Sequence, residues 1–288
     1  MGRASWEWPA APPEAYRGQL DGAFQRHLAA QWADVEREDC FFYHSAEMPD
    51  GEVIPGAWDL RGTEERYLGH VDVAGHRVLE LGPATGHLTW WMESRGADVV
   101  GFDAGFDVTI DLLPVPGRDL DADRREAMRG EGIAAVQNSW WYLHRELKSE
   151  AKMAYGDIYA MPDDLGRFDV AVFGAILLHL HDPFSALAEA AAMTEGTMVV
   201  VDLIQGGLGQ EHDALMRFDP LAAPEHRTNW WALSPGAVIA MLRRLGFGNT
   251  RVERHTQRHH LGHRLDEPPT GMEMFTVVGE RSAGAASR

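Results

Sequence analysis

The sequence predicts an α/β protein in which a mostly parallel sheet of seven strands carries helices on both faces. Between residues 77 and 247, short apolar segments of strand length alternate with segments of helical pattern, as in parallel sheets covered on both sides. The last two strand-like segments have no helix between them, so one of them is expected to be antiparallel. With 288 residues, 45% of them hydrophobic, the chain can bury a large core.

Seven segments have the composition of strands. They are "RVLELG" (77–82), "DVVGFDA" (98–104), "KMAYGD" (152–157), "RFDVAVFGAIL" (167–177), "GTMVVVDLI" (196–204), "NTRVERH" (249–255) and "MEMFTVVGE" (272–280). Helices are expected over residues 14–37, 63–71, 86–96, 139–150, 182–194 and 234–247. Thr63 and Ser234 are the expected N-caps of two of them, and Gly246 stands near a C-cap.

The segments divide the chain into two parts. Residues 1–62 are expected to form an N-terminal helical arm or cap with an aromatic loop, and residues 63–288 the α/β domain. Two insertions, at about 105–150 and 204–233, are too long for simple connections and follow strands at their carboxyl ends. Because open α/β sheets bind ligands at that edge, we expect both insertions, with residues 38–62, to form a lid over a substrate.

Composition and charge narrow the classes of partner. The formal net charge is −18 and only two residues are lysine, so binding to nucleic acid is not favoured. No apolar run reaches the roughly 18 residues that a membrane span needs. Cys40 is the only cysteine, which excludes an internal disulfide and is typical of a cytoplasmic protein. We therefore expect a small-molecule substrate, and the sequence leaves the oligomeric state open, with a homodimer among the options.

The stretch "HRVLELGPATGHLTWW" predicts a strand, a glycine turn and the start of a helix, an arrangement that holds nucleotides. Gly82 and Gly86 allow a sharp turn and a close ligand. A dinucleotide fingerprint would need glycines at 82, 84 and 87, but Ala84 and His87 stand there. No phosphate-binding GxxxxGK[ST] motif is present either.

Two further acids follow strands in the same way. Asp103 ends the next strand, 21 residues after Gly82, where a carboxylate can accept hydrogen bonds from both hydroxyls of a ribose. Asp157 ends the following strand beside Ile158. A carboxylate next to an apolar side chain suits an adenine, with its amino group on Asp157 and its ring face on Ile158.

Together these motifs resemble the class I S-adenosylmethionine-dependent methyltransferases, over about residues 63–280. The resemblance implies a Rossmann-like sheet, S-adenosylmethionine as cofactor and S-adenosylhomocysteine as product. It implies the methionine end at the Gly82 loop, the ribose at Asp103 and the adenine at Asp157 and Ile158. The expected cofactor-binding residues are Trp58, Arg61, Glu80, Gly82, Gly86, Asp103, Ala104, Asp157, Ile158 and Gly174.

A closer resemblance is to the bacterial tRNA wobble-uridine carboxymethyltransferases and their relatives. It is carried by "GAWDLRG", "AILLHLHDPFSAL" and "WWALSPGAVIAMLRRLGF". It implies that Trp58 reaches the cofactor. In that subgroup a tyrosine helps to hold the carboxylate of carboxy-S-adenosylmethionine, but Leu178 occupies this position here. A plain methyl donor is therefore expected.

Methyl transfer requires in-line alignment and, for a hydroxyl acceptor, a base that removes its proton. His179 and His181, which follow the fourth strand, and His44, in the aromatic loop, are the candidate catalytic residues. Arg61 is expected either to pair with the methionine carboxylate or an acidic substrate, or to form a salt bridge with Asp59 or Glu64.

Aromatic residues of the loop and insertions are candidates for a flat substrate pocket, although aromatic stripes also pack cores. The expected substrate-binding residues are Tyr43, Trp140, Trp141, Trp230 and Trp231. The histidines at 255, 259, 260 and 263 have no companion cysteine and no HExxH motif, so no metal site is predicted.

These observations predict a methyltransferase that acts on an oxygen or nitrogen of a small metabolite, as in secondary metabolism. Two alternatives stay open. One is a tRNA-modifying transferase of the carboxymethyl type, which a basic surface patch would favour. The other is a protein that binds the cofactor without turnover, since a fold does not by itself determine a function.

Overall fold

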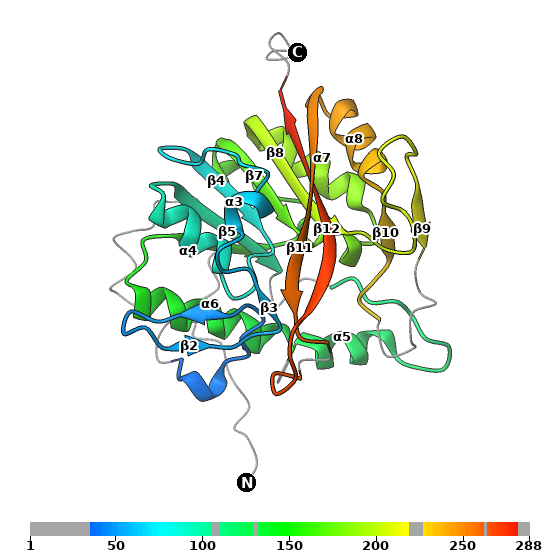
Figure 1. Cartoon of the computed structure of the whole chain (residues 1–288). Helices are drawn as coiled ribbons and strands as arrows, with labels where there is room; N and C mark the ends of the chain where they lie inside the picture. The colour runs from blue at the N-terminus through cyan, green and yellow to red at the C-terminus, as the bar shows by residue number, and fades with distance from the viewer. Residues whose placement is uncertain (1–34, 105–109, 129–131, 219–226, 262–263, 282–288) are drawn as a thin grey trace.

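The computed structural model describes residues 35–104, 110–128, 132–218, 227–261 and 264–281, so all but the last three residues of the helix expected over 14–37 lie outside the described part. The centre of the molecule is one eight-stranded sheet in the order β3-β11-β12-β8-β7-β4-β5-β6 (Figure 1). An α/β architecture with a large, mostly parallel sheet is thus confirmed.

Five neighbouring strands of this sheet are parallel. They are β4 (Arg77–Leu81), β5 (Asp98–Ala104), β6 (Lys152–Gly156), β7 (Phe168–Gly174) and β8 (Thr194–Leu203). The expected antiparallel strand is β12 (Thr270–Glu280), which runs against both β8 and β11 (Asn249–His259). The eighth strand is β3 (Trp58–Asp59), which pairs with the end of β11. Two residues are too few to display an alternating pattern, so the sequence predicts only seven strands.

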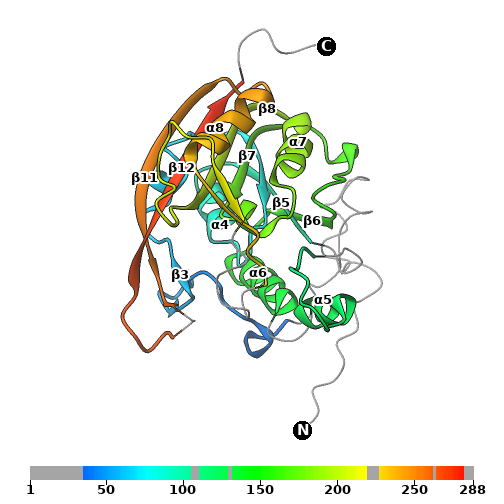
Figure 2. The same ribbon diagram turned by 90° about the vertical axis from the view of Figure 1, so that its right-hand side faces the viewer.

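Helices cover both faces of the sheet (Figure 2). On one face, α7 (Pro183–Met193) and α8 (Pro235–Arg244) contribute Leu187 and Val238 to a core that includes Val200. On the other, α4 (His87–Ser94) and α6 (Ile133–Leu147) form a second core with Val199 and Val201. Successive side chains of β8 thus enter opposite cores, as strand geometry requires.

The helix caps are confirmed in one of the two expected cases. The Ser234 hydroxyl accepts from the backbone nitrogen of Ala237 at 3.1 Å and caps α8, and Gly246 follows that helix with φ +95°. Thr63 stands at the N-cap position of α3 (Glu64–Tyr67) but does not cap it. Its hydroxyl instead lies 2.7 Å from both the Leu60 carbonyl and Oε1 of Gln257, because a partner on β11 competes for it.

The insertions contain regular structure. In the first, α5 (Leu120–Met128) precedes α6, which lies below α4 in both ribbon views and is part of the core. In the second, β9 (Met216–Phe218) and β10 (Trp231–Leu233) form an antiparallel pair. A similar short pair, β1 (Ala46–Glu47) with β2 (Val53–Ile54), lies in the N-terminal loop. The division at residue 62 stays a prediction.

Three short 3₁₀ helices complete the described elements: η1 (Arg37–Asp39), η2 (Asp163–Leu165) and η3 (Leu177–His179). The chain runs from β4 outward to β5 and β6, and then returns past β4 to β7 and β8. This reversal opens a crevice at the carboxyl ends of β4 and β7, the place where open α/β sheets bind ligands. Within the described ranges, no helix is long and apolar enough to cross a membrane.

Candidate functional site

The carboxyl edge of the parallel strands gathers the motifs that are scattered along the sequence. Gly82 follows β4, Asp103 lies near the end of β5, and Asp157 follows β6, and these three strands are neighbours. Gly174 ends β7 on the other side of β4. Parallel pairing therefore brings the three motifs together along one edge of the sheet.

The glycine turn has the backbone conformation that glycine permits. Gly82 and Gly86 have φ angles of +67° and +85°. A Cβ atom on Gly82 would lie 2.5 Å from the side chain of Ile176, and one on Gly86 would lie 2.6 Å from Trp90 and 2.7 Å from Trp140. Both positions thus need glycine for two independent reasons, the left-handed backbone and the lack of space.

Ala84 also adopts a left-handed backbone, with φ +51°. A left-handed conformation costs an L-residue about 1 kcal/mol relative to glycine. We expect Ala84→Gly to raise the free energy of unfolding by up to about 1 kcal/mol, less the entropy that the freer unfolded chain gains. Chemical denaturation of the two proteins measures this difference. A loss of more than about 1 kcal/mol would contradict the assigned strain.

Two buried acids, Glu80 and Asp103, lie on β4 and β5, the two neighbouring strands at the glycine turn. Glu80 accepts a hydrogen bond of 2.5 Å from the Thr89 hydroxyl, and burial raises the pKa of its carboxyl to about 7. Asp103 accepts from the backbone nitrogen of Ala104 at 2.7 Å, and burial raises its pKa to about 6. Neither acid has an ion pair within the described residues. Two buried carboxyl groups near the glycine turn therefore lack a cation within the described residues.

A cavity of about 130 Å³ opens between the glycine turn and the N-terminal aromatic loop. It is lined by Tyr43, His44, Trp58, Leu60, Tyr67, Gly82, Ala84, Gly174, Ala175, Ile176, His179 and Met274. Since one water molecule needs about 10–15 Å³ of a cavity measured in this way, the cavity has room for part of a ligand rather than for a whole nucleotide. It joins the turn to the end of β7.

Hydrogen bonds hold the aromatic wall of this cavity. The indole nitrogen of Trp58 donates to the Tyr43 hydroxyl at 3.1 Å. The backbone carbonyl of Tyr67 accepts from Thr276, whose oxygen in turn lies 2.9 Å from His255. Burial lowers the pKa of His255 to about 4, so this ring is neutral and structural. No group of three metal-ligating side chains occurs within the described residues.

His87, the first residue of α4, joins this helix to α3 and to the aromatic loop. Nε2 of His87 lies 3.0 Å from Glu64, and its Nδ1 lies 3.2 Å from the carbonyl of Ser45. Burial alone would raise the pKa of Glu64, but the hydrogen bond from His87 and others lower it below its ordinary value. Carboxylate and carbonyl oxygens accept hydrogen bonds, so both ring nitrogens of His87 face acceptors that join α4 to α3 and to the aromatic loop.

His44 has a different environment, although it is a neighbour of this pair. Its backbone nitrogen donates to Thr85 at 2.8 Å, but no described residue bonds its Nδ1. Burial, together with the charge of His87, lowers the pKa of His44 to about 3. His44 therefore lines the cavity as a neutral ring, and such a weak base is poorly suited to remove a proton at neutral pH.

His179 and His181 take different places. Nδ1 of His179 donates to the Thr228 carbonyl at 2.9 Å, the ring lines the cavity, and burial lowers its pKa. His181 is half-exposed outside the cavity lining, where its Nδ1 lies 2.9 Å from Asp111. Both His44 and His179 therefore line the cavity as neutral rings, and since the pKa of His44 is too low for a base, His179, which the Asn229 side chain also hydrogen bonds, is the better candidate.

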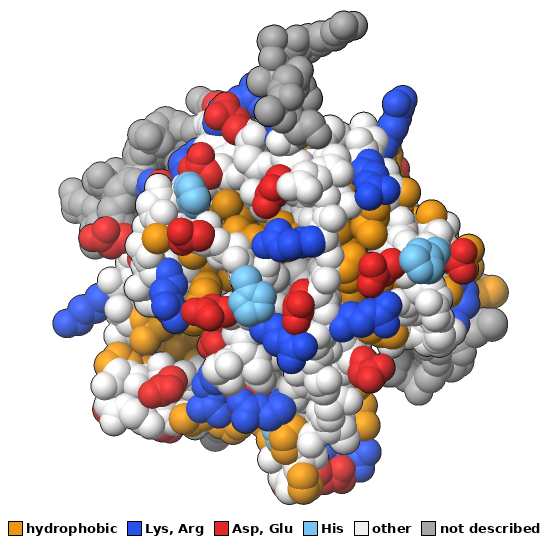
Figure 3. Space-filling view, turned by 45° about the horizontal axis from the view of Figure 1, so that its top comes forward, with side chains coloured by type: hydrophobic (Ala, Val, Ile, Leu, Met, Phe, Trp, Pro, Cys, Tyr) orange, Lys and Arg blue, Asp and Glu red, His pale blue; other side chains and the backbone are white. Residues whose placement is uncertain are grey.

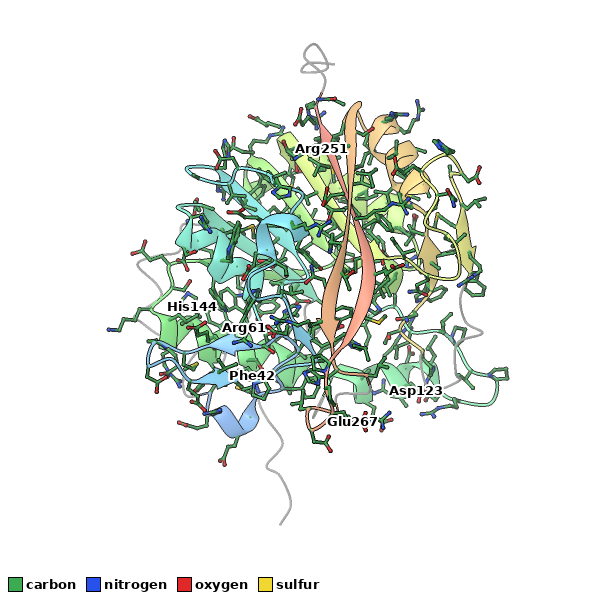
Figure 4. The ribbon with its side chains drawn as sticks, viewed as in Figure 1. Phe42, Arg61, Asp123, His144, Arg251 and Glu267 are labelled. Carbon is green, nitrogen blue, oxygen red and sulfur yellow. The ribbon has the colours of Figure 1, made fainter. Side chains whose placement is uncertain are left out.

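The other predicted residues are divided between the site and its surroundings. Arg61 binds Asp59 with two hydrogen bonds, of 2.8 and 3.1 Å, at the lower edge of the sheet (Figure 4). Trp140 and Trp141 are buried in the core and do not line the cavity, because α6 turns them toward α4 and β6. Trp230 and Trp231 lie beside His181, outside the lining.

Asp157 and Ile158 follow β6, and the Asp157 carboxylate accepts from the backbone nitrogen of Tyr159 at 2.9 Å. Sequence reasoning missed Tyr67, Met274, Gln137 and Asp202. Gln137 donates to the Ala104 carbonyl at 3.0 Å and hydrogen bonds Asp103, so it orients the end of β5. A glutamine inside an aromatic helix is the one signal that could have indicated this role.

Comparison with known proteins adds the family. Residues 59–252 match the methyltransferase domain family. A tRNA U34 carboxymethyltransferase from Marinobacter nauticus is 25% identical over 206 residues, which are 70% of this chain but 53% of that protein. The chain thus spans about half the length of this relative.

One of the solved structures to which the chain is similar supports a shared fold. The N-terminal domain of EvdMO1, crystallised with S-adenosylhomocysteine, is 16% identical with a TM-score of 0.50, over 85% of this chain and 94% of that one. A 1,6-didemethyltoxoflavin-N1-methyltransferase from Burkholderia thailandensis is 14% identical with a TM-score of 0.46, over 78% of each chain. Because the family match covers most of the α/β domain, and its limits enclose the glycine turn and both strand-end acids, the chain belongs to the methyltransferase domain family.

Proposed function

We propose that the protein transfers the methyl group of S-adenosylmethionine to a nitrogen or oxygen of a small metabolite. The observation that carries this proposal is the shared edge of the sheet, which holds Gly82, Asp103 and Asp157 and, beside Gly82, a cavity that His179 also lines. Family membership supports the class of reaction. Which acceptor is bound depends on the side chains and charges that line the cavity.

The residues at the edge fit the cofactor. Gly82 and Gly86 leave the turn without side chains, so a ligand can approach the backbone. Asp103 would accept hydrogen bonds from the ribose hydroxyls, while Asp157 and Ile158 would hold the adenine. Glu80 and Asp103 have no cation of their own, which suits a ligand that carries positive charge. When bound, S-adenosylmethionine supplies a methyl group activated by its sulfonium charge.

The protein's own part in the reaction is alignment and proton removal. Tyr43 and Trp58 close the cavity against water, and the hydrogen bond between them fixes both rings. The Thr228 carbonyl holds the proton of His179 on Nδ1, so the lone pair lies on Nε2. From there His179 can accept the proton that the acceptor atom loses.

The surface charges favour a small acceptor over tRNA. The named relative is a tRNA-modifying enzyme, and an enzyme of that kind needs unpaired cations. Here the arginines of β11 pair with acids, and Figure 3 shows basic and acidic side chains intermixed over one face of the molecule. The pairs are Arg66–Glu253, Arg251–Glu280, Arg254–Glu211 and Arg258–Asp59. Figure 4 labels Arg251 and Arg61 at opposite ends of the sheet, far from forming one patch.

The cofactor assignment predicts a weaker and less pH-dependent complex when Asp103 is removed. Asp103→Ala is expected to raise the Kd for S-adenosylhomocysteine by about tenfold or more, since two hydrogen bonds to a carboxylate are lost. The carboxylate is the accepting form and its pKa is about 6. Affinity should therefore fall as pH drops through 6 in the native protein, and the variant should show a flatter profile.

Calorimetric titration from pH 5 to 8 measures both effects, with carboxy-S-adenosylmethionine and NAD as comparison ligands. The matched control is Asp98→Ala, at the exposed opposite end of β5. Equal affinity of Asp103→Ala and the native protein would remove the ribose assignment. Tightest binding of the carboxylated donor would instead favour the carboxymethyl reaction.

A further inference from the structure

We propose that Gln137, on α6, is a positioning residue for the cofactor, whose amide group holds the Asp103 carboxyl in the ionised form that accepts the ribose hydroxyls. This role rests on the proposed binding of S-adenosylmethionine, and it adds a residue from outside the three strand-end motifs. Three features carry it: the contacts of the Gln137 amide, its burial, and the lack of a cation beside Asp103 within the described residues.

The Gln137 amide closes a ring of polar groups at the end of β5. Its Nε2 donates to the Ala104 carbonyl at 3.0 Å, and the side chain also hydrogen bonds the Asp103 carboxyl. Oδ1 of Asp103 in turn accepts from the backbone nitrogen of Ala104 at 2.7 Å. Carboxylate and carbonyl oxygens accept hydrogen bonds, so the amide nitrogen, with its two N–H groups, faces both of them. The carboxyl group is therefore held by the backbone and by α6 together.

The other end of the same amide shows what fixes its orientation. The Gln137 side chain is 1% exposed, and its Oε1 has no hydrogen-bond partner within the described residues. A buried acceptor without a partner is costly. Reversing the amide would place this oxygen against the oxygens of Asp103 and Ala104, which repel it. The two hydrogen bonds donated by the nitrogen, one of them to a charged group, therefore determine how Gln137 lies.

Packing of α6 against the sheet presents this amide to Asp103. Trp141, four residues after Gln137, donates from its indole nitrogen to the Tyr155 hydroxyl at 2.9 Å. Tyr155 lies opposite Asp103 in the pairing of β5 with β6. Residues four apart share one face of a helix, so Gln137 and Trp141 meet the two neighbouring strands together. The amide is thus in place before a ligand binds.

The titratable groups that face Asp103 give it no positive charge. They are Glu80 on β4, an acid, and Tyr155 on β6, whose pKa burial raises so that the phenol stays neutral. On α6, the side chain that faces it is the uncharged Gln137. Burial raises the pKa of Asp103 to about 6, and the hydrogen bonds from Ala104 and Gln137 oppose that rise. Gln137 is therefore the described side chain that favours the carboxylate.

The test follows the Kd for S-adenosylhomocysteine from pH 5 to 8.5, by calorimetry on the full chain. Gln137→Met keeps the length of the side chain but removes both donors, which raises the pKa of Asp103. Because the carboxylate is the accepting form, the fall in affinity on acidification should begin about one pH unit higher than in the native protein. Affinity should be about fivefold below native at pH 6 and within about twofold of native at pH 8.5.

Two further variants sharpen the comparison. Gln137→Glu places a second carboxyl group beside Asp103 and should move the fall in affinity to higher pH at least as far, so it carries the test if Gln137→Met does not fold. Asn138→Leu is the matched control, because this equally buried amide on α6 donates to the Asp39 carbonyl at 3.0 Å instead. It should keep the native pH dependence.

Equal loss of affinity at every pH in the Gln137 variants would overturn the inference, because a purely structural role weakens the site without moving its titration. An unchanged pH dependence would overturn it as well. Added to Asp103→Ala, Gln137→Met should change the Kd by less than about twofold, and a larger further change would show that Gln137 does not act through Asp103. Failure of the native protein to bind S-adenosylhomocysteine would instead overturn the proposed function, so the two failures are distinguishable.

Discussion

Replacement of His179 by alanine is expected to lower the rate of methyl transfer about 10²–10⁴-fold, while the Kd for S-adenosylhomocysteine stays within about threefold. The imidazole lines the cavity, and the Thr228 carbonyl leaves its Nε2 lone pair available. The measurement is transfer of labelled methyl groups to an acceptor found by screening small amines and alcohols. Because the pKa of His179 is below its ordinary value, the native rate should hold as pH falls to about 6.5 and decline only below that.

His181→Ala is the comparison, because this half-exposed ring binds Asp111 outside the cavity lining. It should retain most of the rate. Full activity of His179→Ala would exclude it as the base, and loss of rate in His181→Ala alone would transfer that role to His181. Equal loss of cofactor affinity in both variants would indicate a structural effect instead.

Replacement of Trp140 by alanine is expected to lower the free energy of unfolding by about 3–5 kcal/mol. The indole is fully buried between Trp90 and Trp141, at ring-centroid distances of 4.9 and 4.6 Å, and it stacks on His144. Removal leaves a cavity beneath the glycine turn, since the ring lies next to Gly86. Urea unfolding followed by tryptophan fluorescence and circular dichroism measures the loss.

Trp91→Ala provides a matched control on α4, where the half-buried indole packs against Arg95 with 4.9 Å from the guanidinium carbon to the ring centroid. Its cost should be about 1 kcal/mol. A stable Trp140→Ala protein that loses acceptor binding would contradict the core position and restore the substrate role that its sequence context predicts.

The sheet could be predicted from the sequence because its strands are apolar runs with clear limits. The segment "DVVGFDA" coincides with β5, and the antiparallel strand follows from the missing helix before residue 272. The glycine turn could also be predicted, since Gly82 and Gly86 stand where a left-handed backbone is needed. Local chemistry therefore determined most of the architecture and the position of the crevice.

The walls of the cavity could not be predicted in the same way. Tyr67 and Met274 have ordinary core patterns. Pairing of β12 with β8 brings Met274 to the crevice, and packing of α3 against β12 brings Tyr67 there. Trp140 and Trp141 looked like pocket residues because an aromatic stripe has the same sequence whether it faces a ligand or a core. Two partners were predicted for Arg61, and in the structure it forms an ion pair with the nearest acid, Asp59. Such competition between partners is decided by tertiary structure.

The pairing of β3 with β11 joins two segments that lie far apart in the sequence. Trp58 faces His259 across this pairing, with their rings 4.2 Å apart, and 259 − 58 = 201 residues separate them. During synthesis, at about 5–20 residues per second, Trp58 leaves the ribosome roughly 10–40 s before its strand partner exists. The aromatic wall thus closes only after the β11–β12 hairpin emerges, so this side of the cavity forms long after its own residues have been synthesised.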